Sequence, residues 1–351
     1  MIDRKTFLKS LGLMAGFSWF FPSNSNSLTQ INSRASAMEK ILPKRLKKGD
    51  VIGLVTPSGI ITSQQLDEMV EKIEKLGYKT FYKPSVLSAY GYFAGTDQER
   101  ADELMDMFAN KEVDAILCAR GGYGAIRMLD LLDYEVIKTN PKIFIGYSDI
   151  TAIITAIFQK TGLVCFHGPV GTSTFNDFSM KSFNDVLVDP KNHYKYPYEK
   201  EEKGEENPEF DFYTINGGNA EGELIGGNVS VLASLIGSKF DTNFENKIVY
   251  LEDVDEKIYS VDRMLVHLIH ATNINKAAGL VLGVFNNCSV NDKPSFTLRE
   301  VIIDLLKPLN IPTVYGFPFG HIKNKMTIPT GVYAKFNADK KTLKLMEKAV
   351  G

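Results

Sequence analysis

The chain has 351 residues, of which 44% are hydrophobic and 23% charged, and its 40 Lys and Arg nearly balance its 42 Asp and Glu. This composition is typical of a globular protein and excludes a disordered or collagen-like chain. The formal charge of −2 and the lack of a basic stripe argue against nucleic-acid binding. A chain of this length usually forms two domains.

Residues 1–37 have the order of an export signal. A basic stretch, Arg4–Lys9, precedes the apolar run Leu11–Phe21 and a polar spacer that ends in Ala35-Ser36-Ala37. The apolar run is shorter than the ~20 residues of a membrane-spanning helix, so we expect no stable membrane span. The basic stretch resembles a twin-arginine signal, although Lys5 replaces the second arginine. We expect a periplasmic protein; the alternative is a cytoplasmic chain that starts at Met38.

From Asp50 onward, short apolar runs alternate with amphipathic helices, which is the pattern of βαβ units around a parallel sheet. The pattern predicts a doubly wound domain over residues 46–170, whose ligands bind beyond the carboxyl ends of the strands. The predicted strands are Val51–Val55, Lys79–Tyr82, Asp114–Cys118, Lys142–Tyr147 and Leu163–Phe166, and the predicted helices are one ending at Gly77, then Asp97–Phe108, Ile126–Leu132 and Ile150–Gln159.

Residues 171–218 are rich in Asn, Asp, Ser and Lys and are interpreted as a polar linker or a lid. A second, smaller and mixed α/β domain is predicted over residues 219–345. Its expected helices are Asn228–Ile236, Lys257–Ala271 and Leu298–Leu306, and its expected strands are Gly222–Gly226, Lys247–Leu251, Ala278–Phe285 and a broken β stretch over Thr313–Phe336.

The strongest local signal is Gly146-Tyr147-Ser148-Asp149, where an apolar strand meets a helix. In hydrolases such a turn exposes a nucleophilic serine, and the next backbone N–H can stabilise an oxyanion. The alternative is that Ser148 or Asp149 only caps the following helix. Ile150 stands where a G-x-S-x-G motif would have its second glycine, so the motif alone does not decide.

Two further groups would complete a serine nucleophile's catalytic set. Among five histidines, His321 follows a Gly/Pro-held loop, which is the kind of position that presents a catalytic side chain. Glu252 follows the predicted strand Lys247–Leu251 and is the preferred acid, whereas its acidic neighbours are interpreted as a solvated turn. As a base, His321 would give a rate that rises with pH, with a pKa near ~6.5 in an ordinary environment.

The remaining motifs predict no metal and no cofactor. His267 and His270 are three residues apart on a helix, but no carboxylate pattern completes a zinc site. Three scattered cysteines in apolar runs are interpreted as core thiols. The glycine-rich segments Arg120–Gly124 and Gly226–Asn228 match no phosphate-binding motif and fit better a close backbone approach to a ligand or an oxyanion.

Taken together, five motifs in this order resemble the LD-carboxypeptidase family of serine peptidases, over about Leu46 to Phe336. The motifs are Arg120-Gly121-Gly122-Tyr123-Gly124, Gly146-Tyr147-Ser148-Asp149, Gly226-Gly227-Asn228, Leu251-Glu252-Asp253 with Tyr259 and Asp262-Arg263-Met264-Leu265, and Gly316-Phe317-Pro318-Phe319-Gly320-His321.

The resemblance implies a Rossmann-like amino-terminal domain that carries the nucleophile and a smaller carboxyl-terminal domain that carries the acid and the base. It implies Ser148 as nucleophile, Glu252 as orienting acid and His321 as general base. The backbone amides of Gly122 and Asp149 would form the oxyanion hole. It also implies a homodimer that uses no metal.

The activity implied by the resemblance is removal of the terminal D-alanine from murein tetrapeptides through an acyl-enzyme. We expect Arg120 and Asn228 to contact the substrate, Arg120 through its carboxylate, although a structural ion pair suits Arg120 equally well. A sister branch of the family, which inactivates peptidyl-nucleotide antibiotics of the microcin C type, is the alternative. An exported solute-binding protein without catalysis is the second alternative.

Overall fold

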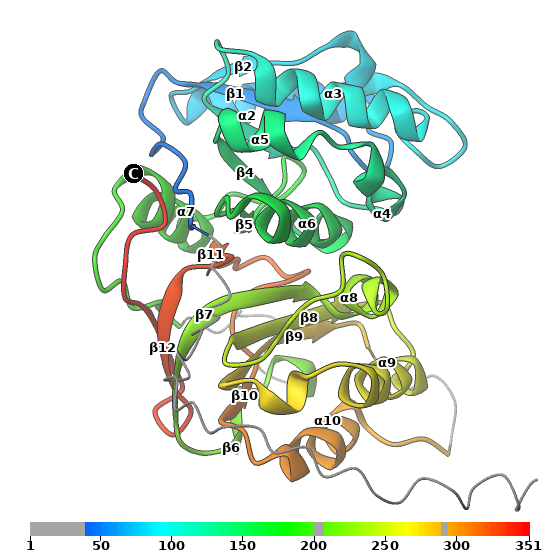
Figure 1. The fold of residues 1–351 in the computed structure, drawn as a ribbon, viewed down its shortest axis with the longest axis vertical. Helices are drawn as coiled ribbons and strands as arrows, with labels where there is room; N and C mark the ends of the chain where they lie inside the picture. The colour runs from blue at the N-terminus through cyan, green and yellow to red at the C-terminus, as the bar shows by residue number, and fades with distance from the viewer. Residues whose placement is uncertain (1–38, 199–206, 289–293) are drawn as a thin grey trace, which may run out of the picture. The chain divides into compact units, whose positions relative to one another are not determined.

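The computed structural model describes residues 39–198, 207–288 and 294–351. The predicted export signal, residues 1–37, lies outside the described residues. The described chain from residue 39 onward belongs to one compact unit (Figure 1). In the part of the chain that the structure describes, no helix is long and apolar enough to span a membrane.

The first sheet confirms the predicted doubly wound architecture. Five strands pair in parallel in the order β5-β4-β3-β1-β2, and the sixth strand, β11, pairs antiparallel with β5. This order is one of the two common doubly wound arrangements. The parallel strands are β1 (Val51–Val55), β2 (Lys79–Phe81), β3 (Ala115–Cys118), β4 (Ile143–Gly146) and β5 (Phe166–His167). Their helices are α2 (Ser63–Lys75), α3 (Asp97–Ala109), α4 (Ala125–Met128), α5 (Tyr134–Thr139) and α6 (Thr151–Thr161).

Local sequence explains where the elements of this sheet begin and why they are buried. Thr62 and Thr96 each start a helix with a capping box, in which the threonine and a side chain three residues later satisfy backbone N–H groups. Every residue of β3 and β4 is buried, as expected for parallel strands covered on both faces. The three cysteines are free and buried, as expected for core thiols.

The second sheet is mixed, as predicted for the carboxyl-terminal domain. Strands β7, β8, β9 and β10 run parallel, while β12, β13 and β6 pair antiparallel at the two edges. The strands are β6 (Tyr213–Asn216), β7 (Asn219–Asn228), β8 (Ile248–Val254), β9 (Gly279–Asn286), β10 (Thr313–Tyr315), β12 (Tyr333–Asn337) and β13 (Thr342–Leu345), and the helices are α8 (Val229–Leu235), α9 (Ile258–Ala271) and α10 (Leu298–Leu306).

Residues 171–218, interpreted as a polar linker, contain regular and buried structure. Helix α7 (Asp177–Phe183) starts at an Asn176 cap and continues into a π-helical turn, Asn184–Val188. Phe183 and Leu187 from this segment are buried in the largest core cluster. The composition hid this helix because two of its four buried residues, Ser179 and Ser182, are polar.

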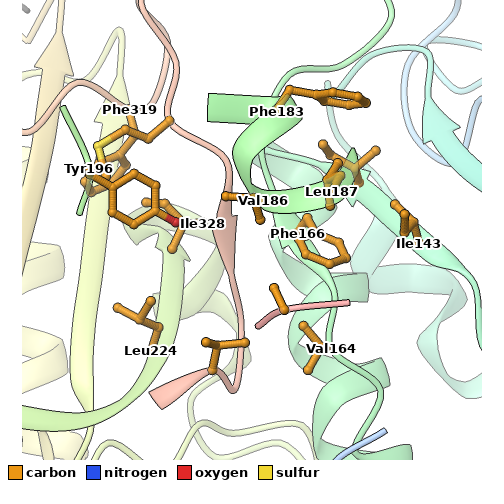
Figure 2. Packing of buried hydrophobic residues seen from close by; sticks show 14 of the residues in the cluster. Ile143, Val164, Phe166, Phe183, Val186, Leu187, Tyr196, Leu224, Phe319 and Ile328 are labelled. Carbon is orange, nitrogen blue, oxygen red and sulfur yellow. The ribbon is translucent and has the colours of Figure 1, made fainter. Parts of the chain in front are cut away.

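The two sheets share that core (Figure 2), which contains Phe166 of β5, Leu224 of β7 and Ile328 of β11. Strand β11 (Ile328–Pro329) comes late in the chain but completes the first sheet by pairing with β5. A second contact joins α6 to β7: a Cβ at Gly227 would lie 2.4 Å from the Thr151 side chain. Any larger residue at Gly227 would therefore push the two parts of the protein apart.

Phe166→Ala should lower the free energy of unfolding by about 3–5 kcal/mol, because a fully buried aromatic ring leaves a cavity in the shared core. Urea unfolding of the purified protein would measure the change. Phe296→Ala is the matched control, since that ring is 67% exposed, and should change the free energy by no more than about 0.5 kcal/mol. Equal shifts for both variants would contradict the role given to the shared core.

Candidate active site

Ser148 lies in a strained turn directly after β4. Its φ of 64° places a non-glycine residue in the left-handed region, which is uncommon and costs free energy. Glycines make room for this turn: a Cβ at Gly146 would lie 2.8 Å from the Ile150 side chain, and one at Gly121 would lie 2.9 Å from the Ser148 Cβ. Neither Ser148 nor Asp149 caps α6 through its side chain. The capping interpretation of the motif is therefore not met for α6, and the nucleophile interpretation stays a prediction.

The Asp149 carboxylate joins the loops that follow three neighbouring strands. Its Oδ2 accepts hydrogen bonds from the Ser58 hydroxyl at 2.6 Å and from the Ala125 backbone N–H at 2.8 Å. Burial raises the pKa of Asp149, although these hydrogen bonds oppose the shift. The contact fixes the turn after β4 against the loops after β1 and β3. Ser58 was not predicted, although it lies at the strand end where the fold places ligands.

Gly122, one of the two expected oxyanion-hole donors, lines the same pocket as Ser148. Gly122 has a φ of 131°, and a Cβ there would lie 3.0 Å from the Gly59 backbone nitrogen, so only glycine fits. Among the described residues, the N–H groups of Gly122 and Asp149 donate to no protein acceptor. Both expected donors are therefore available to a ligand.

Glu252 and His321 form the expected pair, with 2.7 Å between Glu252 Oε2 and His321 Nδ1. One detail of the expectation is wrong: β8 continues to Val254, so Glu252 lies inside the strand and is completely buried. His321 reaches it because Gly320, with a φ of 102°, brings the backbone close; a Cβ there would lie 2.7 Å from Glu252 Oε2. The Asn286 amide also donates to the His321 carbonyl at 3.0 Å.

Each member of the pair shifts the pKa of the other. Burial alone would raise the pKa of Glu252, but the charge of His321 and its hydrogen bond hold that pKa below the ordinary value. Burial likewise disfavours the His321 cation, but Glu252 outweighs it and raises the pKa of His321. The ordinary value expected from sequence therefore does not apply to this histidine.

Asn228 supports Glu252 rather than a substrate. It is buried, and its amide nitrogen donates to Glu252 Oε1 at 3.3 Å and to Asp253 Oδ1 at 3.0 Å. Its amide oxygen accepts from Val231 N–H and caps α8. With both ends of the amide engaged, Asn228 has no group left for the substrate contact that we expected. Asp253 is also buried, against the expectation of a solvated turn, and burial raises its pKa to about 7.

A pocket of about 460 Å³ brings the predicted groups together. It is lined by Ser148 and His321 with Gln65, Arg120, Gly121, Gly122, Tyr147, Val170, Thr172, Val254 and Asp255. The Tyr147 ring packs edge-on against the His321 ring, with 4.8 Å between centroids. Arg120 donates to the Ile60 carbonyl at 3.1 Å and has no ion pair among the described residues, so its charge faces the pocket uncompensated.

None of the other described histidines lines this pocket. His193, His267 and His270 are exposed. His167 is buried, with 5.9 Å between its ring centroid and that of Phe319, and burial lowers its pKa to about 4. In the part of the chain that the structure describes, no three His, Cys, Asp or Glu side chains gather as a metal site would require.

Comparisons with known proteins identify the family to which the chain belongs. The amino-terminal domain of LD-carboxypeptidase matches residues 52–168, and the carboxyl-terminal domain matches residues 221–336. The chain belongs to the LD-carboxypeptidase family. A probable murein peptide carboxypeptidase of Bacillus subtilis is 36% identical over 301 residues, which cover 86% of this chain and 92% of the relative. Family membership makes the chain a serine-type carboxypeptidase.

Two solved structures share the fold. The microcin C7 self-immunity protein MccF matches with a TM-score of 0.81 and 26% identity, over 89% of this chain and all of that one. A muramoyltetrapeptide carboxypeptidase from Oxalobacter formigenes matches with a TM-score of 0.72 and 27% identity, over 84% of this chain and 97% of that one. The two-domain architecture predicted from sequence is thereby confirmed.

The pKa of His321 should lie above 6.5, the ordinary value, because the Glu252 carboxylate stabilises the imidazolium. Glu252→Gln should lower that pKa, since the glutamine keeps the size of the side chain but removes its charge. NMR titration of the His321 ring in both proteins would measure the change. Glu256→Gln is the control and should leave the pKa in place. A pKa that does not fall in Glu252→Gln would contradict the electrostatic origin of the shift.

Proposed function

We propose that the chain hydrolyses the L,D-peptide bond before the terminal D-alanine of murein tetrapeptides, through an acyl-enzyme formed on Ser148. The observation that carries the proposal is that a strained serine and a carboxylate-bound histidine line one pocket. A binding protein has no need for this combination. The murein peptide carboxypeptidases among the relatives support the substrate class.

The geometry supports the following proton transfers. Glu252 binds His321 Nδ1, so the neutral ring holds its proton there and leaves Nε2 free to accept the Ser148 proton. Ser148 then attacks the carbonyl carbon, and the N–H groups of Gly122 and Asp149 stabilise the oxyanion. The imidazolium gives its proton to the departing D-alanine amine. Water, activated by the same histidine, then releases the acyl group and restores Ser148.

Arg120 is the proposed partner of the terminal carboxylate. Its guanidinium lines the pocket, and one N–H group is fixed by the Ile60 carbonyl. An Arg binds a carboxylate through two parallel hydrogen bonds, which would fix the carboxyl end of the peptide relative to Ser148. This contact would restrict cleavage to the last residue of the peptide.

The purified protein should release D-alanine from L-Ala-γ-D-Glu-diaminopimelate-D-Ala, and Ser148→Ala should reduce kcat at least about 10³-fold, as expected for loss of a nucleophile. An enzymatic D-alanine assay measures this.

The kcat/KM of the wild type should rise with pH through the raised pKa of His321, because only the neutral ring accepts the proton. A flat profile from about pH 5 to 8 would contradict the role of His321.

A peptidyl-nucleotide substrate is the second candidate, because MccF shares the fold over nearly all of the chain. The same proteins would be tested on a peptidyl-nucleotide of the microcin C type. Cleavage of that compound without D-alanine release, lost in Ser148→Ala, would replace the murein assignment. No cleavage of either compound by the folded wild type would favour a binding protein.

We also propose that residues 1–37 direct export, on the order of basic stretch, apolar run and small-residue site in the sequence. Cell fractionation followed by mass measurement should find a periplasmic form that begins near Met38. A full-length protein confined to the cytoplasm would overturn this proposal.

A further inference from the structure

The pocket around Ser148 contains two fixed charges of opposite sign besides His321. Arg120 and Asp255 line it, and neither takes part in an ion pair among the described residues. All other lining side chains are uncharged. A ligand that carries both a carboxylate and an ammonium group would compensate both charges, whereas a neutral ligand would compensate neither.

Asp255 is held at the end of β8 by the elements that also hold the catalytic histidine. Its backbone N–H donates to the Asn286 carbonyl at 3.0 Å, and Asn286 in turn binds the His321 carbonyl through its side chain. Asp255 Oδ1 accepts from the Asn287 amide at 2.5 Å. Oδ2 accepts no hydrogen bond from the described residues, and the side chain is exposed. One carboxylate oxygen therefore remains available to a ligand.

We propose that Asp255 binds an ammonium group on the side chain of the residue whose carbonyl Ser148 attacks, and so selects a diamino acid before the terminal D-alanine. This inference rests on the proposed function and adds the substrate feature that the pocket recognises. The proposal places the peptide carboxylate on Arg120 and the acyl residue over Ser148, so that its side chain reaches toward Asp255, the other charge that lines the pocket. A peptide bound in the reverse direction would place like charges together.

Asp255→Asn separates this role from a structural one. Asparagine keeps the oxygen that accepts from Asn287, and it tolerates the φ of 57° that Asp255 adopts. Only the negative charge is removed. Glu256→Gln is the matched control, because Glu256 is the next carboxylate along the chain but does not line the pocket.

The experiment compares two peptides, L-Ala-γ-D-Glu-Lys-D-Ala and its norleucine analogue, which lacks the ammonium group. The wild type should have the higher kcat/KM on the lysine peptide. Asp255→Asn should reduce the ratio of the two kcat/KM values about tenfold, as expected for a partly solvated charge-assisted hydrogen bond. The norleucine reaction should hardly change. Glu256→Gln should keep the wild-type ratio.

Binding measured by calorimetry on Ser148→Ala gives a second readout that needs no turnover. Ser148→Ala should bind the lysine peptide more tightly than the norleucine peptide, and adding Asp255→Asn should abolish that preference. A ratio that Asp255→Asn leaves unchanged in both assays would overturn the inference, while D-alanine release by the wild type would still support the proposed function. Lysine preference in binding without D-alanine release would support the inference and overturn the proposed reaction.

Discussion

The structure depends on a carboxylate that is kept ionised without contact with water. Glu252 is completely buried in β8, where desolvation disfavours its charge, and the hydrogen bond of 2.7 Å to His321 offsets that cost. The Asn228 amide occupies the other oxygen. If the two partners separate, a buried charge is left uncompensated. The strand that carries Glu252 and the loop that carries His321 must therefore stay in contact.

This requirement explains why the two sheets are joined so closely. The proposed nucleophile comes from the first sheet and the proposed acid and base come from the second, so their alignment depends on the contact between the sheets. The shared core, the pairing of β11 with β5 and the fit of Gly227 against Thr151 fix that contact. The Asn228 backbone also donates to the Thr151 hydroxyl at 3.0 Å. A single connection thus links the residue that supports Glu252 to the helix that follows Ser148.

Sequence could predict the architecture because alternation of apolar runs and helical spacing reports burial directly. It could also predict Ser148, Glu252 and His321 as candidates, since each lies in or next to a predicted strand end or a Gly-held loop. Their proximity required the structure. It failed where a polar residue is buried for a specific partner. The predicted strand stopped at Leu251, before Glu252, because the apolar run ends there. Asn228 was assigned to a substrate because its hydrogen bonds to Glu252 and Asp253 are long-range and leave no local signal. Helix α7 was missed because its sequence contains more polar than apolar residues, although part of it is buried.

Two histidines near the pocket show why burial alone does not make a general base. His167 is buried among aromatic rings, with no hydrogen-bond partner for either ring nitrogen among the described residues, and its pKa falls to about 4. His321 is also largely buried, but the Glu252 carboxylate raises its pKa. A base must bind a proton strongly enough to take it from Ser148 and must hold one nitrogen toward the pocket. Only the histidine with a carboxylate partner satisfies both conditions, because that partner fixes the tautomer and stabilises the cation together.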